Sequence, residues 1–142
     1  MKKMLKKISV LLILAMIVGI FQTGEVFAEA KYDKVGSFSE GLARVEKGGK
    51  YGFINKKGEE VVKVGKYEVE KVGKYTEIVR DFSEGLACVY KDGKRGYINK
   101  KGKEVVKLKY DDASSFSEGI APVREGDNWY IIDKKGKVIR KI

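Results

Sequence analysis

The sequence contains no histidine and a single cysteine, Cys88. Without histidine the chain lacks the usual general base of Ser-His-Asp and Cys-His pairs and the side chain that most often binds metals. One cysteine cannot form an internal disulfide or a cysteine-rich zinc site. We therefore interpret Cys88 as a strand residue rather than a nucleophile. We predict no enzymatic activity, no catalytic residue, no metal and no cofactor.

Patterns typical of helices, phosphate loops and calcium sites are also missing after residue 28. No segment there keeps a 3.6-residue apolar period. The glycines do not follow the order of nucleotide-binding loops. Asp33 and the Asp111-Asp112 pair lack the dense Asp/Asn/Gly spacing of a calcium loop, so we assign them to turns. The expected fold class is all-β.

The first 28 residues have the pattern of a targeting segment rather than of a folded domain. Lysines follow the initial methionine, and Ile8 to Phe21 is an almost entirely apolar run of 14 residues. The polar stretch after it ends in Val26-Phe27-Ala28, which predicts a secretory signal peptide helix cleaved after Ala28. The alternative is a retained membrane anchor, but the run is shorter than the roughly 20 residues that span a bilayer. We expect a secreted or cell-wall-associated protein with no stable membrane span after cleavage.

The charge is strongly basic, with 30 Lys and Arg against 20 Asp and Glu and a net charge of +10. Residues 1–28 hold four lysines and Glu25, a net +3, so the remainder carries +7. This excess favours anionic partners such as cell-wall polymers, lipid head groups or nucleic acid. We do not expect nucleic acid as a partner, because export is predicted and the chain has no recognition motif.

The remaining sequence contains one unit three times. Each copy has Phe-Ser-Glu-Gly, then a short apolar segment, then an aromatic or apolar block that leads into Lys-Lys-Gly. The interval from the phenylalanine to the last glycine is 20 residues in every copy. The first segments are Phe38 to Val45, Phe82 to Val89 and Phe116 to Val123, and the glycines are Gly58, Gly102 and Gly136. A β-branched pair follows each glycine, which we align as Val61-Val62, Val105-Val106 and Val138-Ile139.

Each copy is typical of strands joined by tight turns. In Ser-Glu-Gly the serine can bond local backbone and the glycine tolerates positive φ, while Asn/Asp-Lys-Lys-Gly fits a hairpin loop. We predict an all-β fold of three tandem β-hairpin repeats of about 34 residues, stacked in one compact array because a single unit is too small to fold alone. The domain is residues 29–142, with repeats at about 32–63, 75–107 and 110–142. The extra residues at about 64–74 predict an added strand or hairpin.

The three copies resemble the WG-repeat (KWG-repeat) family of bacterial β-rich proteins. The pattern Phe-x-Glu-Gly-Leu-Ala-x-Val, then Gly-Lys-Trp/Tyr-Gly-Phe-Ile-Asp/Asn-x-x-Gly, covers essentially all of residues 32–142. The Trp-Gly pair is replaced by Tyr51-Gly52, Arg95-Gly96 and Trp129-Tyr130, and the usual proline by Lys63 and Lys107. The resemblance implies a hairpin repeat fold and, for many members, export, but no reaction.

Two sets of residues are candidates for binding. The pairs Lys56-Lys57, Lys100-Lys101 and Lys134-Lys135 recur at one place in each copy, so stacking would align them into a basic stripe. The alternative is that these lysines are solvent-exposed residues of hairpin tips with no binding role. Tyr51, Arg95 and Trp129 would form an aromatic and cationic surface, or would pack in the core. The recurring Glu40, Glu84 and Glu118 we interpret as exposed turn residues, since identical environments cannot separate the pKa values of an acid and a base.

From these features we expect a secreted, non-enzymatic binding or cell-surface module that contacts anionic cell-wall or surface polymers. The alternative is a module that binds another secreted protein. Binding to a polymer through lysines weakens as ionic strength rises, whereas binding through an apolar interface does not.

Overall fold

A computed structural model describes residues 31–74, 76–78 and 80–142. The predicted signal peptide, its helix and its cleavage site after Ala28 lie outside these residues. Within them the chain is all-β and contains no helix, and therefore no helix that could cross a membrane. The predicted fold class of repeated antiparallel hairpins is confirmed.

The strands follow one another in three similar groups with a short hairpin between the first two groups. The strands are β1 (Lys34–Ser39), β2 (Leu42–Lys47), β3 (Lys50–Asn55), β4 (Glu60–Glu68), β5 (Glu70–Val72), β6 (Thr76–Ile78), β7 (Leu86–Lys91), β8 (Lys94–Asn99), β9 (Glu104–Tyr110), β10 (Asp112–Ala113), β11 (Ile120–Glu125), β12 (Asn128–Asp133) and β13 (Val138–Lys141).

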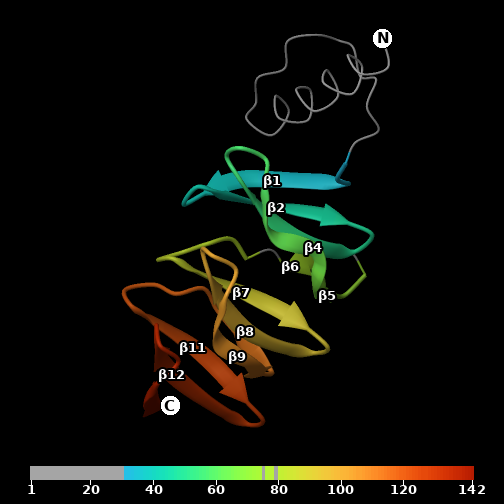
Figure 1. Ribbon diagram of the computed structural model, residues 1–142. Helices are drawn as coiled ribbons and strands as arrows, with labels where there is room; N and C mark the ends of the chain where they lie inside the picture. Colours follow the sequence, from blue (N-terminus) through green and yellow to red (C-terminus); the bar gives the residue numbers. More distant parts are fainter. Residues whose placement is uncertain (1–30, 75, 79) are drawn as a thin grey trace, which may run out of the picture.

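These strands form three antiparallel layers. The first layer is β1–β4, the second is β7–β9 and the third is β10–β13, and within each layer neighbours in sequence are neighbours in the sheet. Figure 1 shows the layers one after another from the N-terminal to the C-terminal end, with the β2–β3, β7–β8 and β11–β12 hairpins pointing the same way. The central hairpins share one register: Leu42 faces Asn55, Leu86 faces Asn99 and Ile120 faces Asp133.

Apolar side chains from neighbouring layers form the core. The ring of Phe82, in the turn before β7, meets the ring of Phe53 from the first layer at 4.9 Å in an edge-to-face arrangement. Phe116 meets Tyr97 in the same way at 4.7 Å. Both phenylalanines are at most 3% exposed. Because each layer covers the face of the one before it, no layer needs a complete core of its own.

In each of the first two layers a glycine allows two neighbouring strands to approach closely: β3 and β4 in the first layer, β8 and β9 in the second. A Cβ on Gly52 would lie 2.2 Å from the Val62 carbonyl oxygen, and one on Gly96 would lie 2.5 Å from the Val106 oxygen. At the matching place in the third layer, Tyr130 pairs with Lys141 and Ile131 with Arg140 without a register shift between them; the shift in this pairing lies between Ile131 and Ile132. A tyrosine therefore fits where the other layers require glycine.

The registers correct our alignment of the third β-branched pair. Phe53 faces Val62 and Tyr97 faces Val106, and the matching residue Ile131 faces Arg140. The structural equivalent of Val61-Val62 is therefore Ile139-Arg140, not Val138-Ile139. The same distance from the turn glycine leads to Ile139-Arg140, but the alignment followed the β-branched residues Val138 and Ile139 and so shifted by one position.

The extra residues between the first two copies form the end of β4 and the β5–β6 hairpin. This hairpin supplies Glu70, whose carboxylate accepts hydrogen bonds from both Nε and Nη2 of Arg95 in the second layer. Glu70 is 7% exposed, so the pair is largely shielded from water. Arg95 thus binds the segment that is inserted between the first two copies.

Candidate functional site

The six turn lysines lie at the exposed corners of the three layers. The pairs occupy the β3–β4, β8–β9 and β12–β13 turns, and all six side chains are exposed: Lys56, Lys57, Lys100, Lys101, Lys134 and Lys135. None of the six forms an ion pair with another described residue. Their charges are therefore available to an external anion.

One turn geometry fixes the lysine backbones in all three layers. The Asn55 side chain accepts hydrogen bonds from the amides of Lys57 and Glu59, each at 3.0 Å. Asn99 and Asp133 do the same in the second and third layers at 2.9–3.0 Å. The glycine that closes each turn has a φ of about +80°, which glycine adopts without strain. The predicted hairpin loop is confirmed, and the three turns are copies of one structure.

Layer stacking sets each turn against the preceding layer. A Cβ on Gly102 would lie 3.0 Å from the Val61 carbonyl oxygen, and one on Gly136 would lie 3.1 Å from Cγ2 of Val106. Each of these turns therefore contacts the last strand of the layer before it, β4 of the first layer or β9 of the second. Consequently, the lysine pairs occupy equivalent places in successive layers.

The second predicted surface, of Tyr51, Arg95 and Trp129, does not form. The three residues are equivalent in register, facing Glu46, Tyr90 and Arg124 respectively, so each belongs to a different layer. Tyr51 is 5% exposed under the second layer, and Arg95 is paired with Glu70. Trp129, at 37%, is the exposed member because no layer covers it among the described residues. Core packing, the alternative that we left open, accounts for Tyr51.

The Ser-Glu-Gly turns have a role that the sequence analysis missed, because they bind the layers to one another. Ser39 Oγ donates to the Phe82 carbonyl oxygen at 2.9 Å, and Ser83 Oγ donates to the Phe116 oxygen at 2.8 Å. Our expectation of a local serine bond is therefore corrected.

The glutamates of these turns form a second set of bonds between layers. The Glu40 carboxylate accepts from the Gly85 amide, and Glu84 accepts from the Gly119 amide, both at 2.7 Å. Both glutamates have φ near +50°, which is uncommon for a residue with a side chain. They are therefore more than exposed turn residues. The sequence feature that could have revealed this role is that the glutamate recurs in every copy although the turn itself does not require it.

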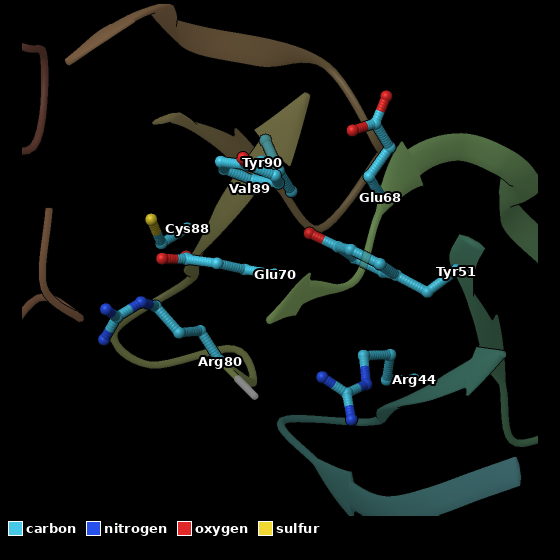
Figure 2. A pocket seen from close by; sticks show the side chains of 8 residues that line it. All are labelled: Arg44, Tyr51, Glu68, Glu70, Arg80, Cys88, Val89 and Tyr90. Carbon is cyan, nitrogen blue, oxygen red and sulfur yellow. The ribbon is translucent and has the colours of Figure 1, made fainter. Parts of the chain in front are cut away.

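A small cavity lies between the first and second layers, beside β5. Its volume of about 10 Å³ is enough for one water molecule. Figure 2 shows Arg44, Arg80 and Cys88 around it, with the Arg80 guanidinium near the Cys88 sulfur. Burial raises the pKa of the Cys88 thiol to about 12, although the nearby Arg80 lowers it somewhat. A thiol held protonated in this way is not an activated nucleophile.

The described residues contain no cluster of three or more metal-binding side chains. No curated protein matches the chain in sequence. A family model described as "WG containing repeat" matches residues 22–51, 51–69, 73–94 and 96–129, which together make up most of the chain. The chain belongs to the family of WG-containing repeat proteins.

Proposed function

We propose that this chain is an exported, non-enzymatic binding module whose three repeats present lysine-bearing turns to an anionic cell-wall or surface polymer. The observation that carries the proposal is the repetition of one rigid, exposed Lys-Lys turn in three stacked layers. The signal-like pattern of residues 1–28 supports the proposal, because such polymers occur outside the cytoplasm.

The repeated turns suit a polymer better than a small anion. A single exposed lysine pair gains little from one anionic group, because water screens the interaction. A polymer presents many such groups on one chain, so contacts at several turns raise its effective concentration and its overall affinity. The net charge of +7 outside residues 1–28 adds a general attraction.

The direct test is co-sedimentation of the purified protein with cell-wall material at two salt concentrations. The Debye length falls from about 10 Å at 0.1 M to about 3 Å at 1 M salt, so we expect binding at the lower concentration and its loss at the higher. The test variant replaces one lysine in each turn, Lys57→Gln, Lys101→Gln and Lys135→Gln. We expect it to sediment much less than the wild type.

A matched control removes the same charge from the opposite hairpin tips. Lys47, Lys50 and Lys91 are exposed residues at the β2–β3 and β7–β8 tips. Their replacement by glutamine should leave binding close to that of the wild type. Equal losses in the two variants would mean that net charge alone is responsible, and no binding at either salt would refute the proposal.

The alternative is a module for another secreted protein. The observation that favours it is the apolar surface at the third layer, where Ile120 and Trp129 are 40% and 37% exposed. Binding to a protein through this surface would persist in 1 M salt, which distinguishes it from polymer binding.

A further inference from the structure

The outward face of the third layer matches the faces that the first two layers bury. Leu42 and Leu86 are 6% and 7% exposed, and the equivalent Ile120 is 40% exposed. Trp129 and Ile131 lie on the same face, opposite Arg124 and Pro122. No layer covers this face among the described residues. A surface built for stacking is thus left open at one end of the array.

The polar contacts that connect the layers are also incomplete at this end. Glu118 has a φ of 54°, matching the 52° and 53° of Glu40 and Glu84, so its turn has the same form. The two earlier glutamates bind glycine amides of the next layer. Within the described part of the chain, Ser117 and Glu118 have no following layer to bind. One hydroxyl donor and one carboxylate acceptor are therefore in position without their usual partners.

The first layer offers the matching half of this interface. Val35 faces Val45 as Ala113 faces Val123, so Val35 and Ala113 are equivalent. Ala113 is fully buried against the second layer, whereas Val35 is 41% exposed. Gly41 is the equivalent of Gly85 and Gly119, and its amide receives no carboxylate among the described residues. The receiving side of the first layer is thus also partly open.

We propose that two copies of this chain associate head to tail, with the third layer of one packing on the first layer of the other. Glu118 accepts from the Gly41 amide of the second copy, and Ser117 donates to its Phe38 carbonyl oxygen. The interface continues the stacking already present between layers, and it goes beyond the proposed polymer binding. By adding turns to the array, it would extend the basic stripe from one copy to the next.

One residue limits the strength of this association. Arg140 stands where the other layers bury Val62 and Val106, and it is exposed. An arginine there must keep its guanidinium in water at the edge of the interface, so it contributes less apolar contact than valine. We therefore expect weak, reversible association, with a dissociation constant between about 10 µM and 1 mM.

Sedimentation equilibrium of the purified protein with two blocked variants tests the proposal. We call the exposed face of the third layer the tail and the exposed face of the first layer the head. The tail-blocked variant carries Glu118→Gln and Trp129→Ser, and the head-blocked variant carries Val35→Asp. We expect the wild-type average mass to rise with concentration and each variant alone to associate at least about tenfold more weakly. An equimolar mixture of the two should form a heterodimer and nothing larger, because it contains one functional head and one functional tail.

A control variant tests for the loss of a carboxylate outside the interface, and a second first-layer variant is used if the first one misfolds. Glu125→Gln removes a carboxylate from the exposed β11–β12 tip and should associate like the wild type. If thermal unfolding shows that Val35→Asp is misfolded, Val35→Lys replaces it. A wild type that stays monomeric up to about 1 mM would overturn the proposal. So would a head-blocked variant that dimerises alone, since this would indicate contact between two third layers. Neither result bears on polymer binding, which is measured separately.

Discussion

Replacing Gly96 by alanine should destabilise the fold more than any other glycine-to-alanine change outside the turns, apart from Gly52. The added Cβ would lie 2.5 Å from the Val106 carbonyl oxygen and 2.8 Å from the Leu108 nitrogen, both of which are backbone atoms. Neither strand can move away freely, because Tyr97 is paired with Val106 and β8 is also bonded to β7. We expect this close approach of β8 and β9 to open and to lose at least one ladder hydrogen bond together with local packing.

The cost of this opening is about 3 kcal/mol, the sum of one lost hydrogen bond and the strain of an overpacked contact. For a domain of this size it corresponds to a fall in Tm of about 12 °C or more. The assay is thermal unfolding followed by circular dichroism, with urea unfolding as a second measure of the free energy.

Gly36→Ala is the matched control. Its added Cβ would lie 3.4 Å from the nearest atom, the Arg44 carbonyl oxygen, which is an ordinary van der Waals contact, and Gly36 does not have a positive φ. We expect its Tm to change by less than about 4 °C. If Gly96→Ala proves as stable as Gly36→Ala, strands β8 and β9 do not approach each other as closely as described. Our explanation of why glycine is required at Gly52 and Gly96 then fails.

Three further predictions concern the contacts between layers. Glu84→Gln should lower the free energy of unfolding in urea by about 1 kcal/mol, because a charge-assisted bond is weakened, while Glu118→Gln should not change it in the monomer. Equal effects would contradict the role of the turn glutamates. Arg95→Ala should cost about 3 kcal/mol in the same assay, because it leaves Glu70 buried without its partner, and a loss below about 1 kcal/mol would contradict this. Cys88, 5% exposed and with its pKa raised to about 12, should resist a disulfide reagent at pH 8 in the native protein and react fully in denaturant; rapid labelling of the native protein would disprove its burial.

The hairpins were predictable because their determinants are local. Glycine at the end of each Lys-Lys-Gly turn and the short apolar segments on either side of the tips specify the hairpins with few alternatives. The exposure of the turn lysines followed from the same reasoning, since a hairpin tip has few neighbours. The constant spacing within the copies then implied that the layers would stack on one another.

What the sequence could not supply were the contacts between layers. Ser39 and Glu40 bind residues more than 40 positions away, and nothing near them in the sequence identifies those partners. The pairing of Arg95 with Glu70 depends on where the inserted hairpin docks, which only the three-dimensional arrangement determines. Tyr51 is buried because another layer covers it. The sequence of its own repeat therefore did not show whether Tyr51 packs in the core or lies on a binding surface.

The claim most open to direct measurement is that the lysine turns act together on one polymer. Three variants each lose one pair: Lys56 and Lys57, Lys100 and Lys101, or Lys134 and Lys135, all replaced by glutamine. Their binding to cell-wall material at low salt is compared with that of the variants that lose two pairs. We predict similar losses of affinity for each single pair and losses that multiply when two pairs are removed. A single turn that accounts for the whole loss, or binding unchanged when two pairs are missing, would contradict the account.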